Sequence, residues 1–439
     1  MVHAAGPNAG RRTGISPKAV VVISILALLV PALALVSADG GPIALYLGAV
    51  VGLGVIIANA IKPWEVYAWR DLWPLMVALA APLVCMLLGN IVHGDWVASE
   101  FEKLIRFALA IPIAWVLMRS PVQWLRHVQW SLLFSAYVGS LMLLVILLSP
   151  DLGRGAVSAF GGKYNAVAFA NLTLFFGFAS CLTLPWTLSR WPRLEAALKL
   201  LAVPLSIYAV WISETRSSWA LFAVLGLVIL LSKQQWTART KLMFVGMALV
   251  FMAVGLSFLW YADGSRFRAI WTDFQRYEQH DRDTSTGIRM QLATASWLMF
   301  KESPWTGVGA GNFREKLAEF RDQGIVTPKV ASDYGEPHND FLGALAGYGM
   351  FGLLSILALY FVPAVTFLRR LRNADATIHT AATIGLLFTL GYAQFSLTEM
   401  MFRNMRSVPI YAVTLAVLYA LSTPRHLAMA DRPSTIISH

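Results

Sequence analysis

The chain has 439 residues, of which 57% are hydrophobic and only 13% are charged, and its mean hydropathy is +0.61. Soluble domains are about 45–50% apolar and about 25% charged, so this composition excludes a soluble globular protein and requires lipid over part of the surface. The formal net charge of +11 would favour nucleic acid in a soluble protein, but here it indicates basic cytoplasmic loops and contact with anionic lipid. Cys85 and Cys181 lie within apolar stretches, which indicates buried thiols and neither a disulfide nor a metal site.

The N-terminus has features of a cleavable signal, because Arg11, Arg12 and Lys18 precede an apolar run that ends near Ala38. That run is long enough to span a bilayer, and apolar segments continue along the whole chain. We therefore expect an uncleaved first helix with a cytoplasmic N-terminus.

Apolar segments long enough to be membrane spans, for which about 20 residues are needed, recur along the chain. The candidates are residues 19–37, 42–61, 72–92, 104–118, 128–149, 164–188, 198–213, 217–232, 241–261, 338–368, 378–397 and 407–423. The sequence therefore predicts an all-α polytopic membrane protein with about 12 transmembrane helices.

The short loops alternate in their content of lysine and arginine, and basic loops stay in the cytoplasm. The basic clusters are Lys62 and Arg70; Arg119 and Arg126; Arg190, Arg193 and Lys199; Lys233, Arg239 and Lys241; and Arg369, Arg370 and Arg372. The loops between them carry few basic residues. This pattern predicts that both termini are cytoplasmic, which agrees with an even number of spans.

Residues 262–337 form the one long connection, and the alternation places it on the outer face. It divides the chain into spans 1–9 within 1–261, the loop itself, and spans 10–12 with a short tail within 338–439. Apolar residues at helical spacing predict short amphipathic helices over 266–280 and 285–301, lying against the membrane. A glycine-rich turn and a further helix over about 312–323 follow.

The first candidate site is the segment 213–219, which places Arg216 and several hydroxyl groups at the outer membrane boundary. Ionisable groups at this depth are costly and often functional. The arginine fork can bind a phosphate, with Trp219 as a supporting residue. Alternatively, Arg216 pairs with Glu214 or reaches lipid headgroups.

The second candidate is the segment 284–289, which opens a helix of the outer loop. Hydroxyls and free amides at a helix start favour anions, and Arg289 adds a full positive charge. An ordinary helix cap with a solvated arginine explains the same pattern.

The third candidate is the segment 336–340, directly before the tenth span. His338 can act as a general base near neutral pH, with Asn339 in support. Alternatively, Asn339 or Asp340 caps the helix and His338 only hydrogen-bonds nearby.

Further outward-facing groups complete the set. The glycine run 307–312, with Gly309 and Gly311, can cradle a phosphate or simply form a turn that needs positive φ, and Lys163 can add a charge or anchor its helix. The D-x-D triplet 281–283 is rejected as a metal site, and no other residues have metal-ligand spacing, so no metal or other cofactor is expected. Basic donors and one histidine on a single face fit a lipid-linked phosphate substrate.

This order of spans and motifs resembles the O-antigen ligase and polymerase superfamily. The resemblance rests on the span pattern and on segments 213–219, 284–289, 304–313 and 336–342. It implies a GT-C-like fold in the inner membrane of a Gram-negative bacterium, with the active site facing the periplasm. The implied reaction is a metal-independent, inverting transfer of glycan from undecaprenyl diphosphate to lipid A–core oligosaccharide.

Carried over to this chain, the resemblance implies that Arg216 and Arg289, with Lys163, bind the donor diphosphate and that His338 deprotonates the acceptor hydroxyl. The partners would be the lipid-linked donor, the lipid A–core acceptor and the bilayer. An O-antigen polymerase or a protein O-oligosaccharyltransferase of the same superfamily remains an alternative, and a transporter of the lipid-linked glycan is an alternative of another class. Whether Gly347 to Gly349 splits the tenth span is left open.

Overall fold

The protein is described here by a computed structural model, which describes residues 16–59, 66–94, 96–149, 151–160, 164–233, 237–243, 246, 273, 281–402 and 407–424. Within these ranges all regular elements are helices. They are α1 (Pro17–Leu33), α2 (Gly40–Asn59), α3 (Val66–His93), α4 (Ala98–Leu117), α5 (Val122–Leu125), α6 (Val128–Leu148), α7 (Arg154–Phe160), α8 (Ala166–Leu182), α9 (Pro192–Ile212), η2 (Arg216–Trp219), α10 (Ala220–Ser232), α13 (Ser285–Glu302), η3 (Ala310–Asn312), α14 (Phe313–Asp322), α15 (Pro328–Asp333), α16 (Asp340–Arg370), α17 (Ala376–Ser396) and α18 (Val408–Ser422).

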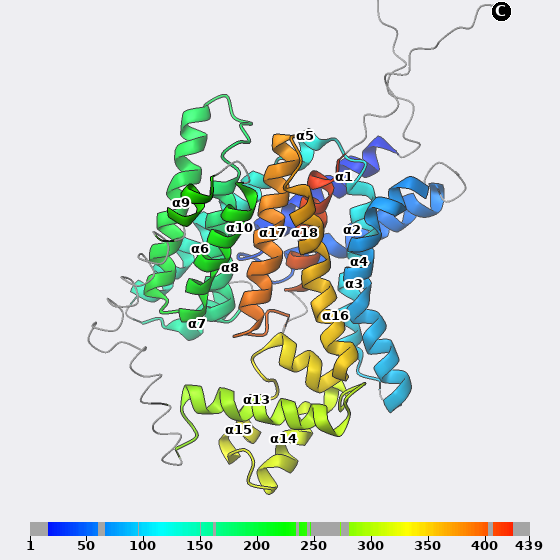
Figure 1. The fold of residues 1–439 in the computed structure, drawn as a ribbon, viewed down its shortest axis with the longest axis vertical. Coiled ribbons are helices and arrows are strands. Elements are labelled where there is room, and N and C mark those ends of the chain that lie inside the picture. The colour runs from blue at the N-terminus through cyan, green and yellow to red at the C-terminus, as the bar shows by residue number, and fades with distance from the viewer. Residues whose placement is uncertain are drawn as a thin grey trace, which may run out of the picture.

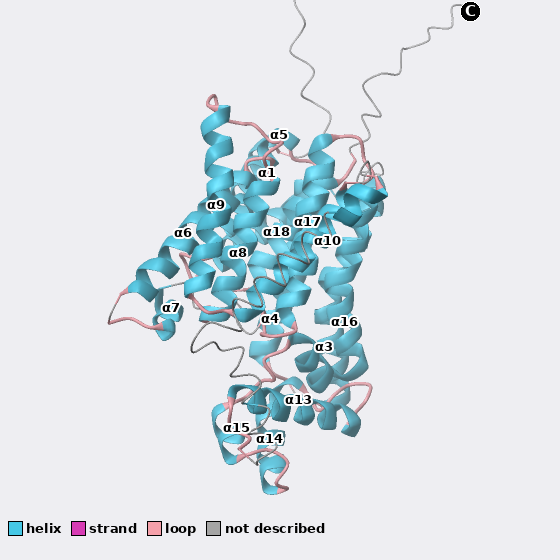
Figure 2. Ribbon diagram, turned by 60° about the vertical axis from the view of Figure 1, so that its left-hand side comes forward, coloured by secondary structure: helices cyan, strands magenta, loops and turns pink. Residues whose placement is uncertain are grey.

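The helices form two groups (Figure 1). The long helices stand side by side in a bundle, and α13, α14 and α15 lie together at one end of it. Turning the molecule keeps the two groups apart, with α5 at the opposite end of the bundle from α13–α15 (Figure 2). We call α13–α15 the outer unit.

The described part of the chain contains six helices long and apolar enough to cross a membrane, namely 40–58, 71–93, 122–148, 192–212, 340–370 and 376–396. Shorter apolar helices cover 17–33, 166–182, 216–232 and 408–422. The chain is therefore a polytopic membrane protein. The predicted span 241–261 falls outside the described residues except for 241–243 and 246, so the count of 12 and the GT-C-like fold stay predictions.

Large apolar side chains are exposed on the outside of the bundle, for example Ile91 at 79% and Ile57 at 71%. By contrast, α18 is buried along its whole length, which is expected of a helix that is apolar all round and surrounded by others. Its Tyr411 lies in a cluster of aromatic rings with Phe402 and Tyr392. Helices α16–α18 and α4 thus pack closely together in the centre of the bundle.

The sequence pattern predicted that Lys199 belongs to a basic loop. This prediction is wrong, because α9 begins at Pro192 and includes Lys199. Its side chain is fully buried and donates to Gln129 Oε1, to the Thr183 and Trp186 carbonyls and to Glu195 Oε1 at 2.6–3.0 Å. These four acceptors replace water, so the charged residue is tolerated inside the helix. The helix consequently starts six residues before the predicted span 198–213.

Helix α16 is split at Gly349, whose φ of 63° and ψ of −147° are not helical. A Cβ at this position would lie 2.5 Å from the carbonyl carbon of Trp305, and φ is in the region that favours glycine. Met350 N donates to the Pro304 carbonyl at 2.8 Å. The structure thus separates a short segment, 340–348, from the long helix that follows, which the sequence left undecided.

The outer unit has its own small core, formed by Ile288, Leu292 and Met299 of α13 with Leu317 of α14 and Val330 of α15. The sequence correctly predicted helices over 285–301 and 312–323, and apolar residues of α13 pack on this core. The contact of these helices with the membrane stays a prediction. The other predicted amphipathic helix, 266–280, lies outside the described residues except for Asp273.

Lys316 fixes α14 against the end of α13. It lies 2.8 Å from Glu319 and 3.0 Å from Glu302. Hydrogen bonds from these two carboxylates raise the pKa of Lys316. The outer unit is therefore tied together by charge as well as by apolar packing.

Candidate functional site

The residue His338 has an unusual backbone, with a φ of +52°. A non-glycine residue in this region costs of order 1–3 kcal/mol and is held there by its surroundings. This backbone conformation makes the chain turn directly before α16. The imidazole ring of His338 packs edge-on against the ring of Tyr334, with 5.6 Å between the ring centroids. The side chain of His338 is 22% exposed, so a substrate can reach it.

One nitrogen of the His338 ring has a hydrogen-bond partner, and the other has none within the part of the chain that the structure describes. Nδ1 lies 3.3 Å from Oε1 of Glu399, whose side chain is only 4% exposed. A carboxylate can only accept, so the neutral imidazole carries its proton on Nδ1 and keeps the lone pair on Nε2. No partner of Nε2 occurs among the described residues, and this is the state that a general base requires.

Three successive residues hold the segment that follows α17. His338 contacts Glu399, and Asn339 Nδ2 donates to the Leu397 carbonyl at 2.9 Å. Asp340 is buried and accepts hydrogen bonds from Ser396 Oγ, Met401 N and Phe402 N at 2.7–3.4 Å.

Asn339 also caps α16, because its Oδ1 accepts from Leu342 N at 3.0 Å. The capping pattern noted in the sequence is therefore present, and it coexists with an open His338 nitrogen.

Arg216 begins η2, a short helix between α9 and α10. Glu214 before it has a φ of 53°, and Ser218 after it donates to Asn171 Oδ1 of α8 at 2.6 Å. Trp219 stacks on Phe222 with 5.7 Å between ring centroids. These contacts fix the backbone around Arg216, whose side chain is half-buried at the end of α9.

The turn after α17 also connects the Arg216 segment to the His338 segment. Gln394 Nε2 donates to the Ser217 carbonyl at 3.0 Å. Five residues later, Glu399 contacts His338. Residues 394–399 therefore touch both segments, which lie more than 100 positions apart in the chain.

Arg289 lies in the second turn of α13, and its side chain is exposed. Thr284 caps this helix through a hydrogen bond from Gly287 N at 3.1 Å. Asp273 Oδ2 accepts from Thr286 N and Oγ1 at 3.4 and 3.1 Å. The carboxylate of Asp273 thus already binds at the start of α13. Of the segment 284–289, the side chain of Arg289 is the group with a positive charge that could bind an anion. No contact between Arg289 and His338 occurs within the described ranges.

The glycine run forms a turn against the outer segment of α16. Gly307 and Gly309 have φ of 67° and 90°. The amides of Val308 and Gly309 donate to the Ala346 and Gly347 carbonyls at 2.9 and 3.2 Å. These two amides are engaged with protein, whereas Gly311 lines a pocket with Gly309. The supporting role predicted for the two glycines stays a prediction.

Two sequence expectations concern groups at the margin of the site. Lys163 lies outside the described residues, so its place relative to His338 is not given. The D-x-D segment has structural contacts, because Asp283 Oδ1 accepts from Thr327 Oγ1 at 2.6 Å and the Arg282 carbonyl accepts from Gln291 Nε2 at 2.8 Å. Among the searched residues, no group of three His, Cys, Asp or Glu side chains is placed to hold a metal ion.

The sequence analysis missed Glu399, the partner of His338, together with Asn171 and Gln394. A signal was present for Glu399, since it is an ionisable residue directly after the apolar span 378–397, and such positions call for a partner. Asn171 Nδ2 and Gln394 Oε1 are buried without a hydrogen-bond partner among the described residues. Both amides therefore have capacity left for a ligand close to the Arg216 segment.

Comparison with known proteins gives two findings. A family model described as O-Antigen ligase matches residues 201–357, which include Arg216, Arg289 and His338 but not Glu399. An uncharacterised protein of Haemophilus influenzae is 19% identical over 312 residues, which cover 70% of this chain and 75% of the relative. Its name carries no function. The family match and the predicted motifs coincide, so residues 201–357 of this chain are similar to the O-antigen ligase family, as the sequence resemblance predicted.

Proposed function

We propose that this protein is an O-antigen ligase, which transfers a glycan from undecaprenyl diphosphate to lipid A–core oligosaccharide on the periplasmic face of the inner membrane. The observation that carries the proposal is the imidazole of His338, with Nδ1 held by buried Glu399 and Nε2 open. It lies within the region that matches the family. Both termini would then be cytoplasmic, with spans 1–9 and 10–12 on either side of the periplasmic loop 262–337.

The proposed reaction is a single displacement at the anomeric carbon of the donor. The acceptor hydroxyl gives its proton to His338 Nε2, its oxygen forms the new glycosidic bond, and the bond to the diphosphate breaks. Undecaprenyl diphosphate leaves with the bonding electron pair. One displacement inverts the anomeric configuration, and a histidine base with arginine donors requires no metal ion in this scheme.

Glu399 supports this step in two ways. Its carboxylate holds the ring by the Nδ1 proton, which fixes the tautomer and the direction of Nε2. It also stabilises the imidazolium that forms when Nε2 takes the acceptor proton, as a buried carboxylate does beside a catalytic histidine. Glu399 is therefore a positioning residue in this proposal.

Arg216 and Arg289 would neutralise the diphosphate, whose negative charge increases as the glycosidic bond breaks. Arg216 is placed at the bundle surface by contacts to α8 and α17, whereas Arg289 projects from the outer unit. A donor bridging the two would link the bundle to the outer unit. Lys163, predicted to add a third positive charge, belongs to the same proposal.

The test is a transfer assay with purified protein, undecaprenyl-diphosphate glycan and lipid A–core in EDTA, read on a gel. A shifted lipid A–core band that His338→Ala removes supports the ligase. His127→Ala is the matched control, because His127 lies between α5 and α6, and α5 lies at the opposite end of the bundle from α13–α15 (Figure 1). A band that His338→Ala leaves unchanged would refute the role of His338.

The same assay separates the alternatives. Growth of the lipid-linked glycan without a shifted lipid A–core band would identify a polymerase, and modified acceptor protein would identify an O-oligosaccharyltransferase. Movement of labelled lipid across vesicles without covalent product would replace the proposal by a transporter.

A further inference from the structure

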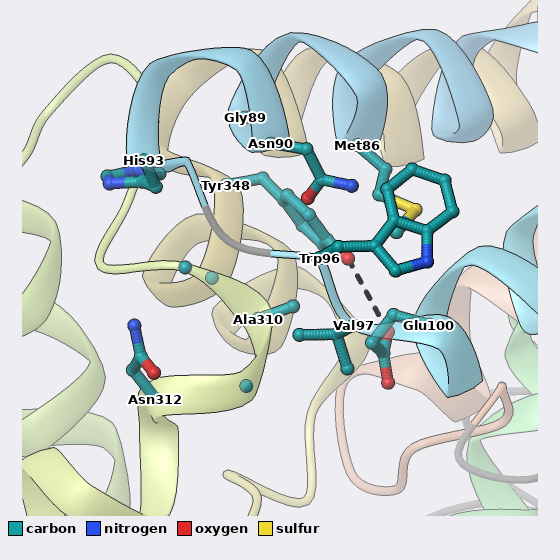
Figure 3. Close-up of a pocket in the computed structure, with 13 residues that line it drawn as sticks. Met86, Gly89, Asn90, His93, Trp96, Val97, Glu100, Ala310, Asn312 and Tyr348 are labelled. Atoms are coloured by element: carbon teal, nitrogen blue, oxygen red, sulfur yellow. Dashed lines mark hydrogen bonds between the residues drawn. The ribbon is translucent and has the colours of Figure 1, made fainter.

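A polar pocket lies where α3, α4, the glycine turn and the outer segment of α16 meet (Figure 3), and neither His338 nor Glu399 lines it. Its volume is about 230 Å³, and it opens to the surface. Pockets for drug-sized ligands hold roughly 300–1,000 Å³, so this pocket is suited to a single ring rather than to a long chain.

Two polar groups in this pocket have unused hydrogen-bonding capacity. Asn90 Nδ2 and His93 Nε2, both on the last turn and a half of α3, are buried and have no hydrogen-bond partner among the described residues. A buried polar atom without a partner is unfavourable, so a ligand that bonds to it recovers the lost hydrogen bond. Figure 3 draws the Asn90 amide beside Tyr348 and Trp96.

The charge in the pocket is already balanced. Glu100 is the carboxylate of the lining, and Lys103 of the same helix lies 2.7 Å from its Oε2 and 2.8 Å from its Oε1. The Tyr348 hydroxyl donates to Glu100 Oε2 at 3.4 Å. An anion would meet this carboxylate and a cation would meet the lysine, so an uncharged polar ligand fits best.

An aromatic face and a bare backbone complete the lining. Trp96 is 59% exposed at the edge of the pocket. Gly309 and Gly311 line the opposite side, where a Cβ on Gly311 would come within 3.0 Å of Val97 Cγ2. A sugar ring has apolar C–H faces for the indole and hydroxyls for amide, imidazole and backbone groups, which matches this combination.

We propose that this pocket is a saccharide-binding subsite, which holds one sugar of a glycan substrate at a distance from the bond that is made. The outer segment of α16 joins the two places, since it begins at the Asn339 cap and reaches the pocket at Tyr348. Nine residues of helix span roughly 14 Å at about 1.5 Å per residue. The choice of saccharide rests on the proposed function, because it is taken from the donor and acceptor glycans.

Binding is measured directly, by saturation-transfer NMR with full-length protein in nanodiscs. The two probes are core oligosaccharide released from lipid A and donor glycan released from its diphosphate. We expect one of them to give a signal that Trp96→Ala and Asn90→Ala abolish. The control Trp297→Ala, which removes a 49% exposed tryptophan from the outer unit, should retain the signal. His338→Ala should also retain it, because His338 does not line the pocket.

Kinetics give the second readout. In the transfer assay, Trp96→Ala and Asn90→Ala should raise KM about tenfold for the substrate whose free glycan binds, with kcat nearly unchanged, as expected for lost uniform binding. Tryptophan also anchors helices at the membrane interface, and loss of such an anchor would affect both substrates alike.

The outcomes separate this inference from the proposed function. No signal from either glycan, a signal that survives both substitutions, or an equal change in KM for both substrates would overturn the pocket. Saccharide binding at the pocket without any transfer by wild-type protein would refute the ligase and leave the pocket intact. If Trp96→Ala does not fold, Trp96→Phe combined with Asn90→Ala gives the same comparison.

Discussion

Two pairs of a basic residue and a glutamate lie at opposite ends of the bundle, and they are built differently. Lys199 and Glu195 are 2.8 Å apart and almost wholly buried, at 1% and 2% exposure. The lysine has four acceptors, and Glu195 accepts in addition from Gln129, Leu188 and Ser189. His338 and Glu399 are 3.3 Å apart, the histidine is 22% exposed, and its backbone is strained.

The two pairs differ in how many of their hydrogen-bonding groups have partners. Every proton of the Lys199 ammonium has an acceptor, so the pair can only hold α9 against α6 and the 183–189 turn. In the His338 ring, Nδ1 is held by Glu399 and Nε2 has no partner among the described residues, so Nε2 can accept a proton from a substrate. A saturated buried pair stabilises the fold, whereas an unsaturated pair at an accessible edge is available for chemistry.

The largest effect is expected from His338→Ala, which removes the open nitrogen. General bases contribute about 10²–10⁴-fold, so kcat should fall by that factor while the thermal unfolding temperature changes little. Initial rates of glycan transfer measure this. Equal rates for wild type and variant would show that the unsaturated pair has no chemical role.

Lys199→Met breaks the saturated pair and leaves Glu195 buried without its cation. Removal of one partner of a buried pair costs about 3–5 kcal/mol, so the unfolding midpoint in detergent should fall strongly. Protein that remains folded should transfer glycan at the wild-type kcat. Restored stability in the double variant Lys199→Met, Glu195→Gln is the control, and a normal midpoint in the single variant would contradict the assignment.

Glu399→Gln keeps an acceptor for His338 Nδ1–H but removes the negative charge. We expect kcat to fall about 10–100-fold, because the imidazolium loses its counter-charge, with KM and the unfolding temperature nearly unchanged. Steady-state kinetics and a thermal melt of the same preparation separate the two effects. A large loss of stability with normal kcat would make Glu399 a structural residue like Glu195.

The smallest effect is expected from Asn339→Ala, which removes the cap of α16 and the bond to the Leu397 carbonyl. Loss of a helix cap costs about 1 kcal/mol, and kcat should fall only a few-fold through displacement of His338. Asn339→Asp keeps the cap but replaces the donor to Leu397 by a carboxylate oxygen that faces this carbonyl, so its loss of stability measures the contact to Leu397 and not the cap. A loss of activity as large as that of His338→Ala would give Asn339 a direct role.

The sequence by itself determined the membrane class and predicted the outward grouping of candidate residues. Both inferences depend on local properties of the sequence. An apolar segment of about 20 residues needs lipid or a protein core around it, and the basic residues in the loops set the direction in which the segment crosses the membrane. His338 and Arg216 were predicted in a similar way, as titratable or charged groups at the ends of apolar segments, and Arg289 was predicted from its place at the start of a loop helix. The helices over 285–301 and 312–323 follow from spacing within each segment.

Only the tertiary structure decided which of these residues have partners. Glu399 reaches His338 across 61 positions, and Lys199 is paired inside a helix although it reads as a loop cation. The break at Gly349 depends on the close approach of Trp305, and the pocket exists because α3, α16 and the glycine turn meet. Such contacts join distant parts of the chain, and local hydropathy and spacing contain no information about which distant groups will meet.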